Sequence, residues 1–395
     1  MVKAINRNVS QAEQSGIRHI MDFTDEPQDV IQLTVGEIDL PTPEATKNAG
    51  IQAIKNNYTK YTANAGAEET RRAIANFVDC HYGMHYDEQH EMIVTVGASE
   101  GIDVVLRTLC EPGDEVVMAS PAYPAYITST EIAGATPVFV DTSTTEFKLT
   151  AQALEQVITD HTKVVILNYP NNPTGTVLSL SELSELARVI KKYDLYVITD
   201  DVYDLLVYGE RHQASSIVTL PQMRPRTIVL NGLSKSHSMT GWRIGYILAS
   251  QKLIEEIYKV HQTTVGGATS ISQAATVAAL TTDKDNPRKL VEVFEKRRQY
   301  VMDNLDTLGL TYVKPEGAFY VFINIREFGL SSWEFAIQLL RHNQLAVVPG
   351  KAFSDEADGY VRMSYAADIT VLREAINRLG QAVTSLRRKE PFATK

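Results

Sequence analysis

The sequence is poor in cysteine, with only Cys80 and Cys110 among its 395 residues. Two cysteines cannot build the disulfide framework of a small secreted domain, and neither lies in a Cys/His cluster with the spacing of a zinc site. The sequence therefore predicts no bound metal. Sparse cysteine also fits a reducing compartment, so we expect a cytoplasmic protein.

Long apolar runs and an excess of positive charge are lacking as well. No stretch approaches the ~18 apolar residues that cross a bilayer, and the first residues carry no apolar run, so we expect neither a membrane span nor a signal peptide. The net charge is −10. This disfavours nucleic acid as the main partner, because a duplex-binding face must meet phosphates with cations. We interpret the small basic cluster at 387–389 as a solvated tail.

Two glycine-rich phosphate-binding fingerprints are also missing. The chain has no Gly-x-x-x-x-Gly-Lys loop, and no Gly-x-Gly-x-x-Gly follows its first strand. Both a P-loop nucleotide-binding protein and a plain dinucleotide-binding protein are therefore disfavoured.

The sequence does contain a regular alternation of short apolar strands and helical patterns. Most strands are near-continuous runs of Val, Ile and Leu, which is typical of strands buried on both faces of a parallel sheet. One intervening helix begins with a capping box at Ser179 and Glu182. We predict a doubly wound α/β domain with a mostly parallel, seven-stranded sheet. Its strands are expected at 92–96, 115–119, 137–140, 163–167, 196–199, 227–230 and 244–249.

The pattern changes after about residue 285. A long charged helix at 288–308 is followed by shorter elements, and the last helix begins after Asp368 with apolar residues spaced three and four apart. At roughly 100–200 residues per domain, the length suggests about two domains. We predict a large domain at 45–285 and a smaller α/β domain from 286 to 395. The shorter elements are expected as strands at 318–323, 346–348 and 360–363 and a helix at 332–341.

Polar residues follow the carboxyl ends of several predicted strands, where open α/β sheets bind ligands. Lys235 comes soon after the strand at 227–230. A lone lysine is usually a solvated surface charge, but an amine that attacks a carbonyl must be partly deprotonated, which burial or a nearby cation favours. Arg243 could supply that charge, or it could bind a phosphate with its planar guanidinium.

Other candidate residues also have a structural alternative. Asp200 could cap the next segment, or it could keep the nitrogen of a heterocyclic ring protonated. The turn at 97–99 could bring backbone amides against an anion at a helix N-terminus, although many α/β turns look alike. Asn172 lies in a turn-like Asn-Pro-Thr-Gly sequence, and Tyr123 could belong to the core or stack on a flat ring.

Taken together, these motifs make the chain resemble the class I aminotransferases of fold type I, which use pyridoxal 5'-phosphate. The resemblance covers essentially the whole chain, and the shared order and spacing of the motifs make it highly specific. The motifs are Asn171-Asn172-Pro173-Thr174-Gly175, Asp200-Asp201-Val202-Tyr203, Ser234-Lys235 through Trp242-Arg243-Ile244-Gly245, Pro315-Glu316-Gly317-Ala318-Phe319-Tyr320 and Tyr360-Val361-Arg362-Met363-Ser364.

The resemblance implies a ping-pong transfer of an amino group from an amino acid to a 2-oxo acid such as 2-oxoglutarate. It implies that Lys235 holds the cofactor covalently and acts as general base, and that Asp200 pairs with the pyridinium nitrogen. Tyr203 and Asn172 would contact the oxygen of the ring hydroxyl. The implied catalytic residues are thus Lys235, Asp200 and Tyr203.

The resemblance also implies which residues bind the cofactor ring, the substrate carboxylate and the cofactor phosphate. Tyr123 would stack on the ring, and Arg362 would bind the substrate α-carboxylate, assisted by Asn172 and the Gly36 backbone. The phosphate would be bound by Ala98, Ser99, Ser234 and Arg243. One departure is that some relatives carry a phosphate-binding hydroxyl three residues before the lysine, where this sequence has Gly232. The phosphate role is therefore carried to Ser234.

Tyr61 resembles the tyrosine that reaches the phosphate of the partner subunit, which implies a homodimer with shared active sites. By the same resemblance, residues 1–44 belong with the smaller domain, and Ser120-Pro121 and Asn172-Pro173 are expected to be cis peptides.

The substrate is less defined. The segments at 232–241 and 15–18 look similar to a bacterial subgroup that includes N-acetyl-LL-diaminopimelate aminotransferases of lysine biosynthesis and aromatic amino-acid aminotransferases. The sequence leaves both possibilities open. A carbon–sulfur β-lyase on the same fold, which would use the same lysine and aspartate, is the alternative function.

Overall fold

The computed structural model describes residues 3–12, 16–23, 29–211 and 213–388. Its largest feature is a seven-stranded sheet with the strand order β2-β8-β7-β6-β5-β3-β4. Strands β3 to β7 run parallel to one another, whereas β8 is antiparallel to both of its neighbours, β2 and β7. The predicted α/β fold with a mostly parallel seven-stranded sheet is confirmed. The strands are β2 (Met92–Thr95), β3 (Glu115–Ser120), β4 (Thr136–Asp141), β5 (Thr162–Leu167), β6 (Tyr196–Asp200), β7 (Thr227–Gly232) and β8 (Gly245–Leu248).

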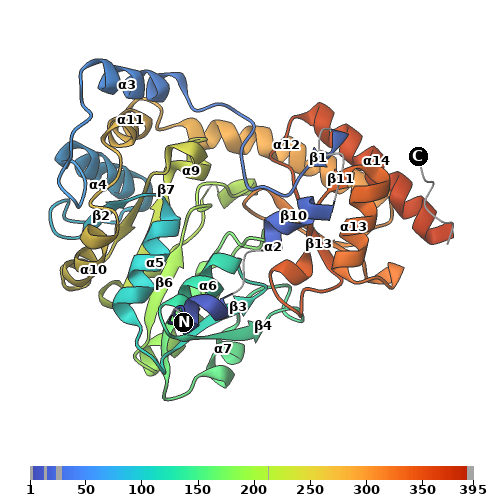
Figure 1. The fold of residues 1–395 in the computed structure, drawn as a ribbon, viewed down its shortest axis with the longest axis horizontal. Helices are drawn as coiled ribbons and strands as arrows, with labels where there is room; N and C mark the ends of the chain where they lie inside the picture. The colour runs from blue at the N-terminus through green and yellow to red at the C-terminus, as the bar shows by residue number, and fades with distance from the viewer. Residues whose placement is uncertain (1–2, 13–15, 24–28, 212, 389–395) are drawn as a thin grey trace.

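Helices cover both faces of this sheet (Figure 1). Neighbouring residues of one strand point to opposite faces, so Val116 packs on the side of α5 and α10, whereas Val117 packs on the side of α7 and α8. This explains the continuous apolar runs, because both alternating sets of side chains are buried. The helices of this part are α3 (Glu44–Lys55), α4 (Glu68–Tyr82), α5 (Ala98–Leu109), α6 (Pro124–Ile132), α7 (Ala151–Val157), α8 (Leu180–Lys192), α9 (Leu233–Ser236), α10 (Gln251–Thr264) and α11 (Ser270–Thr281).

A second, four-stranded antiparallel sheet lies in the C-terminal part, with the order β12-β13-β10-β9. Helices α12, α13 and α14 accompany it on the right of Figure 1. The predicted strand at 346–348 is instead two short strands in different sheets, because the chain leaves β11 at Ala346 and joins β13 only at Val348. The elements are β9 (Tyr312–Val313), β10 (Tyr320–Asn324), β11 (Leu345–Ala346), β12 (Val348–Pro349), β13 (Tyr360–Ser364), α12 (Asn286–Thr307), α13 (Ser332–Asn343) and α14 (Ile369–Arg388).

The capping residues named from the sequence have the expected contacts. Ser179 and Glu182 form the full capping box at the start of α8. Asp368 Oδ1 accepts the backbone N–H of Thr370 at 2.8 Å, at the first turn of α14. The predicted strand at 318–323 begins later, at Tyr320, because Ala318 has a positive φ of 55°.

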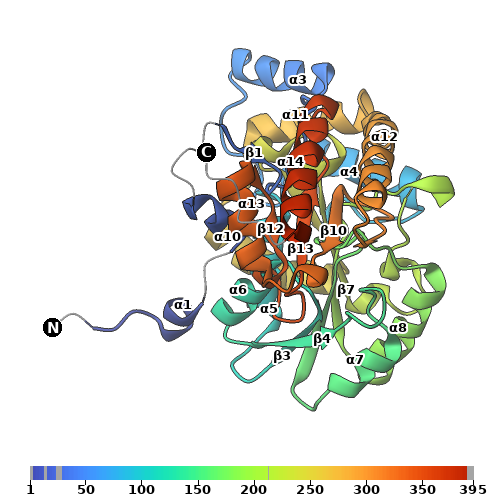
Figure 2. The same cartoon turned by 90° about the vertical axis from the view of Figure 1, so that its right-hand side faces the viewer.

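The N-terminal segment contacts both parts of the chain. Strand β1 (Ile31–Gln32) pairs in parallel with β11, whereas α1 (Arg7–Gln11) lies against α6. Figure 2 shows α1 at the edge of the molecule, on the side of α6. The domain boundaries at 44/45 and 285/286 stay a prediction. Within the described residues, every helix is too short or too polar to span a lipid bilayer.

Candidate active site

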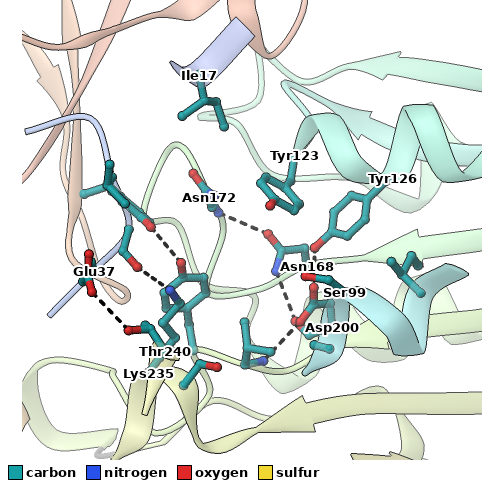
Figure 3. Close-up of a pocket in the computed structure, with 18 of the residues that line it drawn as sticks. Ile17, Glu37, Ser99, Tyr123, Tyr126, Asn168, Asn172, Asp200, Lys235 and Thr240 are labelled. Carbon is teal, nitrogen blue, oxygen red and sulfur yellow. Dashed lines mark hydrogen bonds between the residues drawn. The ribbon is translucent and has the colours of Figure 1, made fainter. Parts of the chain in front are cut away.

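A cavity of about 640 Å³ opens where the strand ends of the large sheet face the C-terminal part and the segment around Gly36 (Figure 3). It collects side chains from segments that are far apart in the sequence. Most predicted ligand-binding residues line it, namely Gly36, Ala98, Ser99, Tyr123, Asn172, Asp200, Tyr203, Ser234, Lys235, Arg243 and Arg362. Tyr61 does not line this cavity, and its side chain is fully exposed.

Lys235 lies on α9, directly after strand β7, and its Nζ donates a hydrogen bond to the Gly36 carbonyl. Burial lowers the pKa of the amine to about 8, and the positive charges of Arg362 and Arg243 act in the same direction. A substantial fraction of this amine is therefore neutral near pH 8, which is the state a nucleophile or general base requires. Glu37 and Asp200 oppose the effect without reversing it.

Asp200 ends β6 inside the cavity and is held by three neighbours. Its Oδ2 accepts the Tyr126 hydroxyl at 2.6 Å, and its Oδ1 accepts the Val202 N–H at 3.3 Å. The Asn168 amide donates to its backbone carbonyl at 3.1 Å. Burial raises the pKa of this carboxyl group, whereas the two hydrogen bonds to its oxygens and the charge of Lys235 act to lower it. The carboxylate is thus fixed in place and has an opposite charge nearby.

Arg362 is only 1% exposed and lies on β13. Its Nη1 donates to Asn172 Oδ1 at 2.7 Å, and its Nη2 donates to the Thr34 carbonyl. The Nε atom is buried and has no hydrogen-bond partner among the described residues. A buried, unpaired donor on a permanently charged group costs free energy, so this guanidinium is suited to receive an anion.

Tyr203 reaches the same region from the loop after β6. Its hydroxyl lies 2.8 Å from the hydroxyl of Tyr320, and either atom can be the donor. The Tyr320 ring centroid is 4.4 Å from the Arg362 guanidinium carbon. A Cβ at Gly36 would lie 2.1 Å from the Tyr320 hydroxyl, so only glycine fits beside this tyrosine. The two tyrosines and Gly36 therefore form one closely packed wall.

The opposite end of the cavity is suited to a phosphate. Helix α5 begins at Ala98, so the free N–H groups of its first turn face an opening that Ser99, Ser234 and Arg243 also line. Gly97 has a φ of 74°, and a Cβ there would lie 2.7 Å from Arg243 Nη2. Glycine thus lets the backbone turn approach the Arg243 guanidinium. The backbone N–H groups at the start of α5 and this guanidinium can therefore bind the same anion.

These features fit a pyridoxal phosphate molecule. The donor set offers an amine with a lowered pKa, a buried carboxylate and the N-terminus of a helix beside an arginine, all along one cavity. The ring of Tyr123 also lines this cavity. Lys235, Asp200 and the start of α5 would hold the aldehyde, the ring nitrogen and the phosphate. Among the described residues, no group of three His, Cys, Asp or Glu side chains could hold a metal ion.

Sequence reasoning missed several residues of the cavity. Tyr126 and Asn168 both hold Asp200, and Tyr320 pairs with Tyr203. Tyr126 lies three residues after Tyr123, so its position one helical turn on was a usable signal. Glu37 and Thr240 were also missed. Both line the cavity, and the Thr240 hydroxyl donates to Glu37 Oε1 at 3.4 Å.

The cis peptides expected at Ser120-Pro121 and Asn172-Pro173 are present. A third, at Tyr169-Pro170, was not anticipated. All three precede or lie within loops at the strand ends that face the cavity.

The fold and the cavity together define a fold type I enzyme that depends on pyridoxal phosphate. Comparison with known proteins gives the family. The model of aminotransferase class I and II matches residues 28–379. The chain belongs to this family, whose members use pyridoxal phosphate, and it is an aminotransferase.

Two curated relatives match over nearly their whole length. A protein of Bacillus subtilis named probable N-acetyl-LL-diaminopimelate aminotransferase is 43% identical over 394 residues, covering 100% of this chain and 99% of the relative. Aromatic-amino-acid aminotransferase 2 of Thermococcus litoralis is 35% identical, covering 95% of this chain and 97% of the relative. Their names differ in the amino acid.

Among solved structures, the aspartate aminotransferase of Thermus thermophilus with maleate superposes with a TM-score of 0.89 at 32% identity, covering 96% of this chain and 100% of that one. The aromatic aminotransferase of Pyrococcus horikoshii gives a TM-score of 0.88 at 35% identity, covering 94% and 99%. The same backbone thus accompanies different named substrates.

Proposed function

We propose that this aminotransferase moves the amino group of N-acetyl-LL-2,6-diaminopimelate to 2-oxoglutarate, as a step of lysine biosynthesis in the cytoplasm. The observation that supports an amino-acid substrate is the Arg362 guanidinium, which is buried at the cavity with an unpaired Nε. An α-carboxylate bound there would supply the missing acceptor. The diaminopimelate derivative is supported by the Bacillus relative, which matches the whole chain at 43% identity.

The chemistry divides among few residues. When bound, pyridoxal phosphate supplies the electron-withdrawing ring that allows an α-proton to leave. Asp200, whose buried carboxylate is fixed by Tyr126, would keep the ring nitrogen protonated. Lys235 takes the α-proton as general base, since its pKa of about 8 leaves much of the amine neutral. Arg362 and Asn172 orient the carboxylate of the substrate, so that the α-proton faces Lys235.

The phosphate is assigned to the other end of the cavity. Ala98, Ser99, Ser234 and Arg243 line that end, and they would bind the phosphate through backbone amides, hydroxyls and a guanidinium. Tyr123 would stack on the ring, and Tyr203 would donate to the oxygen of its hydroxyl substituent. These roles explain why polar groups and the aromatic side chain of Tyr123 line one cavity.

Aromatic amino acids are the second candidate substrates. The side chains of Ile17 and Val35 line the cavity, and apolar residues favour contact with a flat ring. The Thermococcus relative bears an aromatic substrate in its name. The segment at 15–18 is one of the two that look similar to the bacterial subgroup. Within it, Ser15 and the side chain of Arg18 lie outside the described residues.

The experiment is a panel of amino donors tested with 2-oxoglutarate. The bound cofactor changes its absorbance when it accepts an amino group, so each half-reaction can be followed directly. We expect N-acetyl-LL-2,6-diaminopimelate to react with the highest kcat/KM, ahead of phenylalanine, tyrosine and aspartate. A higher kcat/KM for phenylalanine or tyrosine would favour the aromatic assignment. Release of pyruvate and sulfide from cystathionine without any 2-oxo acid would instead support the β-lyase alternative.

We propose further that the enzyme is a homodimer with shared active sites. Tyr61 supports this, because a fully exposed tyrosine on a loop outside the cavity of its own chain is available to a second copy. We also propose that residues 45–285 form the large domain, and that residues 1–44 and 286–395 together form the smaller domain.

A further inference from the structure

A buried ion pair lies directly behind the phosphate end of the cavity. Glu100 is the third residue of α5, immediately after Ala98 and Ser99. Its Oε1 is 2.6 Å from Nδ1 of His261 on α10, and its Oε2 accepts the Val96 N–H at 2.6 Å. The exposed fraction is 7% for the Glu100 side chain and zero for His261. Both carboxylate oxygens are therefore committed, and water is largely excluded.

Both nitrogens of the His261 ring face acceptors. Nε2 lies 2.8 Å from the Asn64 carbonyl, which can only accept, so this nitrogen carries a proton. Nδ1 faces the Glu100 carboxyl group, and one more proton must lie between them. Burial acts to lower the pKa of His261, but the contacts with Glu100 and Asn64 outweigh burial and raise it above its ordinary value. Whichever of the two groups holds the shared proton, the pair carries no net charge.

This neutrality has a consequence for anion binding. The N-terminus of α5 attracts a phosphate because its N–H groups and the helix dipole are positive. A carboxylate in the first turn of the same helix would repel a phosphate at this end, and low dielectric surroundings would strengthen the repulsion. Glu100 is nevertheless useful there, because it fixes the turn that leads from β2 into α5 through the Val96 N–H.

We propose that His261 neutralises Glu100, and that this pair lets the carboxylate shape the start of α5 without weakening its affinity for the cofactor phosphate. His261 and Glu100 are positioning residues, since neither lines the cavity. The proposal rests on the proposed phosphate role of Ala98 and Ser99. It assigns a function to a contact between residues 161 positions apart.

The test compares pyridoxal phosphate with pyridoxal, which lacks the phosphate. The dissociation constants of both are measured on the full-length apoprotein by absorbance titration. The constant for pyridoxal divided by the constant for pyridoxal phosphate gives the ratio that isolates the contribution of the phosphate, and a lower ratio means a weaker contribution. We expect His261→Phe, which leaves Glu100 buried without a counter-charge, to lower this ratio about tenfold. Adding Glu100→Gln to His261→Phe should restore most of the ratio, because the unpaired carboxylate is gone. An unchanged ratio in His261→Phe, or no recovery in the double variant, would overturn the proposal.

Two further variants separate charge from other effects. Gln273→Leu removes another buried side chain, which bonds to Ala67 and Thr62 in the same loop as Asn64. Because this loop also carries Tyr61, a small fall in the ratio is expected, well below that of His261→Phe. An equal fall would show that loosening the loop suffices and would overturn the role of the charge. Glu100→Gln alone should keep or raise the ratio; a fall would contradict the proposal even if His261→Phe does not fold.

The phosphate assignment itself has a separate control. Arg243→Gln should lower the ratio, because Arg243 lines the proposed phosphate end. If Arg243→Gln and Ser99→Ala both leave the ratio unchanged, the phosphate site has been assigned wrongly. If they lower it and His261→Phe does not, only the role of the ion pair fails.

Discussion

The hydroxyl of Tyr126 donates a 2.6 Å hydrogen bond to the Asp200 carboxylate, although neither side chain is exposed to bulk solvent. The bond joins helix α6 to the end of strand β6 in the lining of the cavity (Figure 3). Burial raises the pKa of Asp200, and this bond is the largest influence that lowers it. The ionisation of the proposed partner of the ring nitrogen therefore depends on a tyrosine outside the recognised motifs.

Tyr126→Phe should move the acid limb of the activity profile to higher pH. The pKa of Asp200 rises when the bond is lost, so the carboxylate becomes protonated at a higher pH, and activity falls sooner as pH decreases. A hydrogen bond to a charged group contributes roughly 1.5–3 kcal/mol, which corresponds to a shift of about one to two pH units. The measurement is kcat/KM against pH. Asp200→Asn should be severely impaired at every pH, and an unshifted acid limb in Tyr126→Phe would contradict the coupling.

Lys235 should be the most reactive lysine of the apoprotein at mildly alkaline pH. Its pKa is lowered to about 8 by burial and by Arg362 and Arg243, so its neutral fraction rises through pH 8, whereas an ordinary lysine titrates near 10.4. Competitive labelling with a small acylating reagent, followed by peptide mapping, measures this. Arg362→Met removes one positive charge and should shift the labelling curve of Lys235 to higher pH. A curve that matches the exposed lysines would be inconsistent with the assignment.

Lys235→Ala should abolish turnover but keep part of the affinity for the cofactor, because the phosphate and ring contacts remain. Borohydride reduction of the loaded wild-type enzyme should attach the cofactor to the peptide that contains Lys235, and the variant should stay unlabelled. The exposed Lys252 on α10 offers a matched control. Lys252→Ala should behave as wild type in both assays, and near-normal activity in Lys235→Ala would refute the mechanism.

Arg362→Lys should mainly raise KM for every amino-acid substrate, by about 100-fold. Lysine keeps the charge but loses the planar pair of donors that matches a carboxylate, and it cannot also reach Asn172 and Thr34 as the arginine does. Steady-state kinetics with at least three donors of different side-chain class measures this. Arg298, a buried arginine that bonds to the Pro315 carbonyl and does not line the cavity, provides the control Arg298→Lys. An effect confined to one side-chain class would assign Arg362 to the side chain instead of the α-carboxylate.

The sequence predicted most of the fold because strand–helix alternation and apolar runs are local signals. Lys235, Asp200 and Asn172 could be named because each follows a strand whose carboxyl end faces the ligand edge of the sheet. The structure brings them together as expected, while their roles stay predictions. What local patterns could not give are contacts made by packing between distant elements. Tyr126 meets Asp200 from a helix 74 residues earlier, and His261 meets Glu100 across 161 residues.

Element boundaries failed where backbone geometry overrides composition. The sequence at 346–348 is apolar and reads as one strand, yet β11 and β12 join different partners. The strand expected from residue 244 begins at Gly245, because Arg243 takes a positive φ of 50° beside Gly97. Apolar residues predict burial, but the composition of a segment predicts neither its partner strand nor a residue with a positive φ.

The exposed Tyr61 allows a direct test of shared active sites. Tyr61→Phe should weaken binding of pyridoxal phosphate about tenfold, if its hydroxyl bonds to a phosphate. If that phosphate belongs to a second copy, an excess of Lys235→Ala chains should rescue the Tyr61→Phe protein. A mixed dimer then contains one site with Lys235 from one chain and Tyr61 from the other, whereas its second site lacks both groups. Affinity and activity per Lys235 should return towards wild type as the Lys235→Ala chain is added. If Tyr61 served its own chain, mixing would change neither quantity, because every active Lys235 would still be paired with phenylalanine at position 61.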